Sequence, residues 1–255
     1  MNLTTLLAEL REGILNDRTD RTAGTSDYLW SDERLVRYIN EAQRRFATQG
    51  LVIRDAATAE VCDVTLVSGQ TLYPLHESVI AVVSAKLSSV TADLTRVGHS
   101  LFAASRPASE QWYDTSTYTG LPPGAPVAYS TDEGVSDFNS DSVSQVVLRV
   151  YPAPAAAQAG TVVKLRVIRK PIEELRLTNG GAVPEIPEDH HLEMLDWAAY
   201  LALRIVDDDA GSPARAKEFA ASFDAHVTNA RKLVMRKLFA PQPWGFGRGG
   251  FSWES

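Results

Sequence analysis

The feature that most constrains this chain is an amphipathic stretch over residues 30–46. Its apolar side chains recur at helical spacing, and charged side chains take most of the remaining positions. The apolar positions are Leu35, Ile39, Ala42 and Phe46. Ser31 stands where an N-cap belongs, because its hydroxyl can accept a backbone N–H of the first turn. Trp30 and Leu35 flank this cap at the spacing of a hydrophobic staple. The stretch therefore predicts a helix that buries one face.

Helical periodicity returns at both ends of the chain. A first amphipathic helix is expected from the leucine-rich start. Its apolar positions are Leu3, Leu6, Leu7, Leu10 and Ile14. Residues 187–206 are apolar on nearly every side, which predicts a buried helix. A further helix is expected to start at Ser212 and Pro213 and to carry an apolar stripe as far as Leu238. The simplest assembly packs these helices together as one bundle.

Between the helical ends the pattern changes to short β-like runs. Residues 61–67 and 71–75, separated by a turn at residues 68–70, predict a hairpin. Further strands are expected over residues 79–87, 94–97, 127–129, 146–151 and 162–168. Residues 152–160 are expected to join the last two strands as a loose hairpin.

The expected fold class is therefore α+β: a helical bundle split in sequence around a β-rich insertion, with an extended C-terminal tail. The expected divisions are residues 1–57 for the N-terminal helices of the bundle, 58–183 for the β-rich insertion, 184–240 for the C-terminal helices and 241–255 for the tail.

Composition narrows the class of protein. A hydrophobic fraction of 44% with 22% charged residues is typical of a soluble globular chain. The net charge of −7 argues against a protein that coats nucleic acid with a basic face. Cys62 is the only cysteine, so no internal disulfide can form, and it is interpreted as a small buried strand residue. We expect no signal peptide and no membrane-spanning segment, since every apolar run is short or interrupted by charges.

Motifs that would carry chemistry are incomplete. His190 and His191 lie among acidic residues but lack the spacing that places metal ligands on one helix face. Residues 137–141 begin like a calcium loop, but Ser142 stands where that loop requires glycine. The glycines of residues 245–250 match a dinucleotide fingerprint without its strand–turn–helix context. We therefore expect no catalytic residues, no metal, no cofactor and no enzymatic activity.

Two features point to surfaces instead. Arg231, Lys232, Arg236 and Lys237 end the last helix, and dipole compensation with solvation is favoured over a nucleic-acid patch. The glycine-rich tail carries large aromatics that need a surface to bury them. Its expected partner-binding residues are Trp244, Phe246, Arg248, Phe251 and Trp253. The alternative is a tail folded back over its own bundle.

The amphipathic stretch of residues 30–46, which we call the anchor stretch, also resembles a known family, the head–tail connector (portal adaptor) proteins of tailed phages. The resemblance follows a Trp-Ser-Asp-x-x-Leu-x-x-Tyr-Ile-Asn-x-Ala-Gln pattern. The matching residues are Trp30, Ser31, Asp32, Leu35, Tyr38, Ile39, Asn40, Ala42 and Gln43. Two later landmarks match as well: a Tyr-Pro pair that ends a strand (Tyr151 and Pro152) and an Ile-Pro-Glu-x-His-His run at residues 186–191.

This resemblance implies a structural virion protein made in the host cytoplasm. It would dock on the portal ring and extend the DNA channel towards the tail. Its partners would be the portal protein, further copies of itself in a ring (typically a dodecamer), downstream tail proteins, and DNA that passes without sequence recognition; no membrane is involved. The alternatives are another phage assembly component, such as a tail-tube or scaffold-like protein, and a hydrolase with an unrecognised site.

Overall fold

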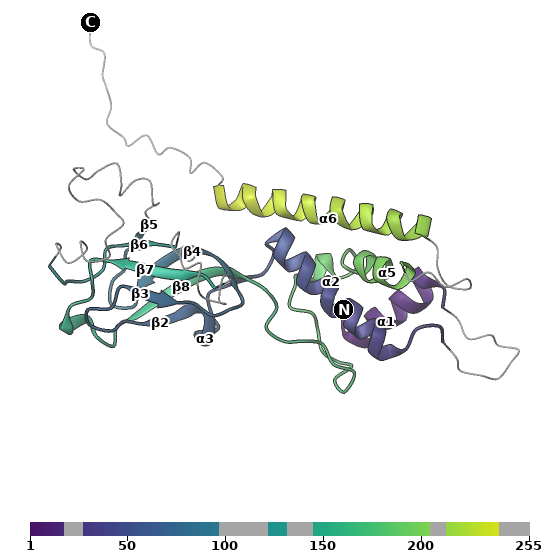
Figure 1. The fold of residues 1–255 in the computed structure, drawn as a ribbon, viewed down its shortest axis with the longest axis horizontal. Helices are drawn as coiled ribbons and strands as arrows, with labels where there is room; N and C mark the ends of the chain where they lie inside the picture. Colours follow the sequence, from purple (N-terminus) through teal and green to yellow (C-terminus); the bar gives the residue numbers. More distant parts are fainter. Residues whose placement is uncertain (18–27, 97–121, 132–144, 205–212, 240–255) are drawn as a thin grey trace, which may run out of the picture.

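The computed structural model describes residues 1–17, 28–96, 122–131, 145–204 and 213–239, and these form a mixed α+β protein. Figure 1 shows the strands gathered towards one end and most helices towards the other. The longest described helix, α6 (Pro213–Phe239), runs along one edge. The predicted α+β class is confirmed. None of the described helices is both long and apolar enough to cross a membrane.

Helix α2 (Asp32–Gly50) is the anchor stretch, and it begins where the sequence predicts. Ser31 Oγ accepts the N–H of Arg34 at an N-to-O distance of 3.4 Å. Trp30 and Leu35 are both buried in one apolar cluster, as a hydrophobic staple requires. Leu51 then takes a left-handed conformation with φ 58° and ends the helix. The predicted helix is confirmed, and it extends past Phe46 to Gly50.

The first predicted helix is a composite. It starts as α1 (Leu3–Ala8) and continues as the π-helical segment η1 (Glu9–Leu15). The wider π turns shift the buried face, so Leu15 is buried whereas Ile14 is only half-buried. The same shift turns Arg11 into the interior, where it is 6% exposed.

The C-terminal helices begin differently from the prediction. Residues 188–190 form a short 3₁₀ turn, η4 (Glu188–His190), and α5 (Leu195–Leu203) starts only after it. Because the tighter turn does not keep α-helical spacing, Leu192 is exposed, although the sequence placed it on the buried helix. Its exposed fraction is 53%. Within α5 the expected burial holds on nearly every side.

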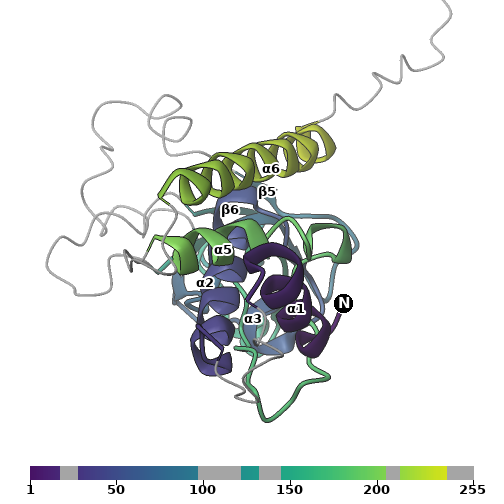
Figure 2. The ribbon, with the colours of Figure 1, turned by 90° about the vertical axis from the view of Figure 1, so that its right-hand side faces the viewer.

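The helices from both ends of the chain share one apolar cluster. Phe46 of α2 meets Phe223 of α6 edge-on, with ring centroids 5.7 Å apart. Trp197 of α5 lies 5.2 Å from the same Phe223 ring. Figure 2 shows α1, α2 and α5 stacked beneath α6.

The strands form two sheets around a second apolar cluster. In the first sheet β8 (Val162–Arg169) pairs antiparallel with β4 (Val79–Leu87), and also with the short β1 (Arg54–Asp55) and β2 (Asp63–Thr65). The second has the order β3 (Leu72–Pro74), β7 (Val147–Tyr151), β6 (Ala128–Ser130), β5 (Thr95–Arg96). Only its β5–β6 pair is parallel among the described strands. The short helices α3 (Ala59–Cys62) and η3 (Ala156–Gln158) complete the β region.

Both predicted hairpins are wrong. The turn at residues 68–70 exists, with Gly69 at φ 77°, but β2 pairs with β8 and β3 with β7. The chain therefore passes from the first sheet to the second at this turn. It returns to the first sheet with β4, enters the second again with β5, and returns once more between β7 and β8. The turn at residues 68–70 and the β7–β8 connection lie side by side, since Gly69 N–H donates to Pro154 O at 2.9 Å. The strands that flank these two connections pair with each other, β2 with β8 and β3 with β7, and not with their neighbours in sequence. Cys62 is buried as expected, but at the end of α3 and not in a strand.

Candidate functional site

The five tail residues predicted to bind a partner lie outside the described residues. These are Trp244, Phe246, Arg248, Phe251 and Trp253. The predicted calcium-like segment at residues 137–141 and the glycines of residues 245–250 lie outside them as well. The described residues place four other polar or grooved features, and each depends on contacts between separate elements of the chain.

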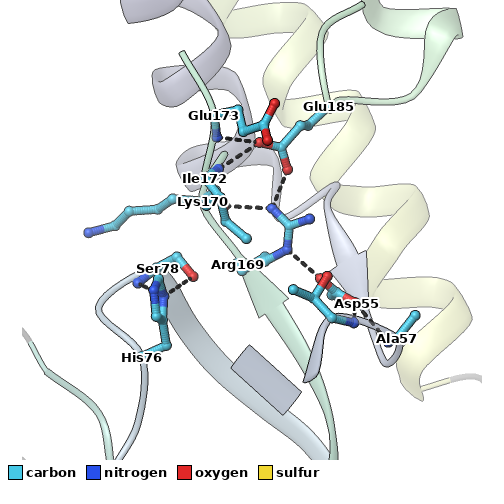
Figure 3. A network of polar contacts seen from close by, with 10 residues as sticks. Asp55, Ala57, His76, Ser78, Arg169, Lys170, Ile172, Glu173 and Glu185 are labelled. Carbon is cyan, nitrogen blue, oxygen red and sulfur yellow. Dashed lines mark hydrogen bonds and ion pairs between the residues drawn. The ribbon is translucent and has the colours of Figure 1, made fainter. Parts of the chain in front are cut away.

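The first feature is a polar joint, formed by Asp55, Arg169 and Glu185 (Figure 3). Arg169 ends β8, and its Nε donates to Asp55 Oδ2 at 2.6 Å. Its Nη1 pairs with Glu185 and also donates to the carbonyl of Lys170 at 3.1 Å. One guanidinium therefore ties β1, β8 and the segment that leads to the C-terminal helices.

Further hydrogen bonds hold the joint's two carboxylates. Asp55 Oδ1 accepts the N–H groups of Ala57 and Thr58 at 2.9 and 3.1 Å. Burial alone would raise the pKa of Asp55, but these bonds and Arg169 outweigh it and hold that pKa well below its usual range. Burial likewise opposes the charge on Arg169, but Glu185 and Asp55 more than compensate and raise the pKa of its guanidinium. Asp55 and Arg169 are therefore both charged at neutral pH.

The second feature is the segment of residues 172–185, which we call the acidic loop. Glu185 Oε1 closes its base by accepting the N–H groups of Ile172 and Glu173 at 2.6 and 2.8 Å. Asn40 of α2 holds Leu175 through both backbone groups, at 2.9 Å to the carbonyl and 2.8 Å from the N–H. The acidic loop is thus fixed at its base and from α2.

The N-terminal helix holds the same loop further along. The N–H of Thr4 donates to Gly180 O at 3.0 Å. A Cβ at position 180 would lie 2.6 Å from Thr4 Oγ1, so any larger residue there would force the Thr4 side chain to shift. Asn40 and Thr4 together give the acidic loop a defined shape.

The third feature explains the Trp-Ser-Asp part of the sequence pattern. Arg11 Nη2 donates to the carbonyl of Trp30 at 3.0 Å and to Asp32 Oδ1 at 2.5 Å. Arg11 Nη1 donates to Asp17 Oδ2 at 3.2 Å, and Asp17 Oδ1 accepts the N–H of Leu29 at 2.9 Å. Asp32 lies in the first turn of α2, where the helix dipole favours negative charge, and it also helps to satisfy a buried guanidinium.

The fourth feature is a groove of 920 Å³ between the end of α2 and the second half of α6. Apolar groups line part of it, from Leu51, Val227 and Met235. Charged and polar groups line the rest, from Thr48, Gln49, Asp224, Thr228, Arg231, Lys232 and Arg236. The three cations are exposed, and none has an ion pair within the described part of the chain. The basic cluster read from the sequence thus borders an apolar groove, which we call the basic groove.

The histidines near the start of α5 make polar contacts with neighbouring segments of the chain. His191 is buried, its Nε2 lies 3.0 Å from Ile186 O, and burial lowers its pKa. His190 Nδ1 contacts Glu193 Oε2 at 2.6 Å, and His226 of α6 reaches the other oxygen of Glu193 at 3.2 Å. These contacts connect η4 and α6 through Glu193. Within the described ranges, no group of three or more His, Cys, Asp or Glu side chains is placed to hold a metal ion.

Two groups with nucleophilic potential are held in unreactive settings. Ser78 Oγ lies 2.8 Å from His76 Nδ1, but that nitrogen also faces the N–H of Ser78 at 3.2 Å, so the contact is a local turn (Figure 3). Burial, followed by the nearby Asp55 carboxylate, raises the pKa of the Cys62 thiol to about 11. The thiol is therefore protonated at neutral pH.

Sequence reasoning found the basic cluster but missed the polar joint and the anchoring of the acidic loop. Asp55, Arg169 and Glu185 come from three separate segments, and no local pattern connects them. Asn40 was visible as part of the anchor pattern, but its contact with Leu175 could not be read from spacing.

Comparison with known proteins finds one relevant family. The family model described as SU10 adaptor protein matches residues 1–242. A comparison with curated proteins finds no match. The family match covers both helical ends, the β region between them and the basic groove.

Proposed function

Because this chain belongs to the SU10 adaptor protein family, we propose that it docks on the portal ring of a tailed phage and extends the DNA channel towards the tail. The single observation that carries the proposal is the family match over residues 1–242. The family is one of phage structural adaptors, so no chemistry is proposed for the chain. Its place of action would be the virion, after synthesis in the host cytoplasm.

We also propose that the chain works as a helical bundle with a β-rich insertion. In this proposal residues 1–57 and 184–240 form the bundle and residues 58–183 the insertion. Two observations support it: the helices of both ends share one apolar cluster, and the strands surround another. The polar joint would fix the angle between the two parts, because Arg169 of β8 binds Glu185 next to the C-terminal helices.

Copies of the chain would surround the channel as a ring, typically a dodecamer, and downstream tail proteins would bind its far side. DNA would pass without sequence recognition. The net charge of −7 supports this, since phosphate binding of high affinity depends on cationic surfaces that release counterions. A largely acidic protein would hold passing DNA only weakly.

The tail of residues 241–255 is the proposed portal contact. It follows α6 directly and combines four aromatic side chains with Arg248 and several glycines. Each fully buried aromatic would contribute roughly 1.5–3 kcal/mol before the cost of ordering the segment. Arg248 could add a charge-assisted hydrogen bond to an acidic partner surface.

Deleting residues 241–255 tests this proposal. We expect the melting temperature to stay nearly unchanged, and both portal binding and the yield of finished particles to be lost. A matched variant that keeps the length but replaces Trp244, Phe246, Phe251 and Trp253 by Ser should behave in the same way.

Two outcomes would contradict the tail's role. A truncated protein that melts much earlier would show that the tail packs on its own bundle. A truncated protein that still binds the portal would place the docking surface elsewhere. If the full-length protein does not bind the portal but assembles with tail components, a tail-tube or scaffold-like role would be favoured.

A further inference from the structure

We propose that the acidic loop of one copy of this chain docks in the basic groove of the next copy. This inference rests on the proposed function only in that a ring needs contacts between neighbouring copies. It identifies the two surfaces that meet, and neither includes the tail.

The acidic loop presents an unusual combination of exposed groups. Ile172, Leu177 and Val183 are 41%, 38% and 58% exposed, so three large apolar side chains face solvent within one short segment. Glu173 and Glu174 are exposed beside them, and Glu174 pairs with Arg44 of α2. Clustered apolar groups flanked by charges are typical of a surface that binds another protein.

The loop's shape is already set before any partner binds. Asn40, Thr4 and Glu185 hold its backbone through the hydrogen bonds described above. A segment that is ordered in advance loses little conformational entropy on docking. The loop is therefore suited to insert into a groove as a preformed unit.

The basic groove offers the complementary chemistry. Leu51, Val227 and Met235 supply an apolar surface, and Arg231, Lys232 and Arg236 supply positive charge that lacks a partner among the described acids. Helix α6 as a whole carries six Lys or Arg and two Asp or Glu, which gives it +4 in a chain of net charge −7. In the acidic loop, Glu174 pairs with Arg44 of α2 at 2.9 Å and Arg176 is an exposed cation, whereas Glu173 makes no ion pair with any described residue. Glu173 is therefore the carboxylate that the loop offers to the cations of the groove.

Geometry makes the contact intermolecular. In Figure 1 the loop between β8 and α5 projects from the lower edge, while α6 runs along the upper edge. Figure 2, seen at right angles, again places them at opposite edges. A loop and a groove on opposite sides of one chain form a head-to-tail contact, which closes into a ring when the rotation between copies allows it.

DNA is the competing occupant of the basic groove. Phosphates would satisfy the cations, but the apolar surface of Leu51, Val227 and Met235 would gain nothing from a sugar–phosphate backbone. The mixed lining favours a protein segment that carries both apolar and acidic groups.

Cysteine cross-linking tests the docking directly. One tagged preparation would carry Leu177→Cys and a second, with a different tag, Lys232→Cys. Cys62 can stay, because it is buried and protonated. We expect a cross-link that joins the two tags, both in concentrated protein and in portal complexes, and little product from either variant alone. Replacing Lys232→Cys by Lys217→Cys, at the other end of α6, is the control and should give no product.

Charge reversal supplies an independent measurement. Glu173→Lys, or Arg231→Glu with Lys232→Glu, should each weaken self-association by on the order of tenfold or more. Combining the loop and groove changes in one chain should restore most of it. Melting curves of every variant would confirm that it is folded, and Lys217→Glu serves as the matched control.

Separate outcomes decide the two proposals. Absence of the mixed cross-link in both preparations, with folded variants, would overturn the docking even if the wild type binds the portal. Failure of the wild type to bind the portal, with the cross-link present, would count against the proposed function and support the docking. Charge reversal in the groove that abolishes DNA retention, without rescue by the loop variant, would show that nucleic acid is the occupant and overturn the inference.

Discussion

Replacing Arg169 by Met tests the physical account of the polar joint. The methionine keeps much of the side chain's apolar length but removes the charge that Asp55 and Glu185 share. Both carboxylates would then lack their cation. We expect this change to be among the most destabilising polar substitutions in the β region.

The size of the effect follows from burial. The side chains of Arg169 and Asp55 are only 11% and 5% exposed, so water cannot replace the lost partner well. Removing one partner of a buried ion pair typically lowers the free energy of unfolding by about 3–5 kcal/mol. Asp55 keeps its bonds from Ala57 and Thr58, which places the expected cost near the lower end, at about 3 kcal/mol.

Lys164→Met is the matched control. Lys164 lies on the same strand, and its Nζ is 2.5 Å from Asp63 Oδ2, but the side chain is 53% exposed. An exposed pair of this kind contributes at most about 1 kcal/mol. Urea unfolding at pH 7, followed by tryptophan fluorescence, would give both free energies of unfolding.

The pH dependence of the free energy of unfolding tests the same account. The pKa of Asp55 is lowered in the folded protein, so its charge stabilises the fold above the ordinary carboxyl pKa, and this stabilisation is lost as the pH falls towards the folded pKa. The difference in free energy of unfolding between the wild type and Arg169→Met should therefore be largest at neutral pH and should become smaller below about pH 4. If Arg169→Met costs no more than Lys164→Met, or if the difference widens in acid, the account of the joint is wrong.

Three further predictions concern single side chains. Ile39→Ala and Phe46→Ala should each lower the free energy of unfolding by about 2–5 kcal/mol, because both are fully buried in the helical cluster; urea unfolding would measure this, and no loss would mean that the stripe is not a core. Asn40→Ala should lower the free energy of unfolding by about 1–3 kcal/mol and speed hydrogen exchange at the Leu175 amide, because that N–H loses its acceptor; unchanged exchange would show that Asn40 does not hold Leu175. Cys62 should react with a thiol reagent at pH 8 only after unfolding, since its pKa is raised to about 11 and it is buried; rapid labelling of the folded protein would refute this.

Several elements could be predicted because their causes are local. Helix α2 is encoded by a cap, a staple and an apolar stripe that lie within one short stretch, and β4 by a run of mostly β-branched and apolar residues. The start of α6 at Pro213 follows from the same kind of signal, since proline fits the first turn of a helix. Such signals act between residues a few positions apart, so the sequence displays them directly.

Tertiary structure decided what depends on distant partners. The β-like pattern of β2 and β3 was visible in the sequence, but their pairing partners were not. Two packed sheets bury more apolar surface than a local hairpin, so β2 pairs with β8 and β3 with β7. The π turns at Glu9–Leu15 replaced Ile14 by Leu15 in the core and buried Arg11, which then required the acids at positions 17 and 32. The joint around Arg169 and the pairing of Asn40 with Leu175 arise in the same way. Their energies depend on burial and on geometry between segments that only the folded chain brings together.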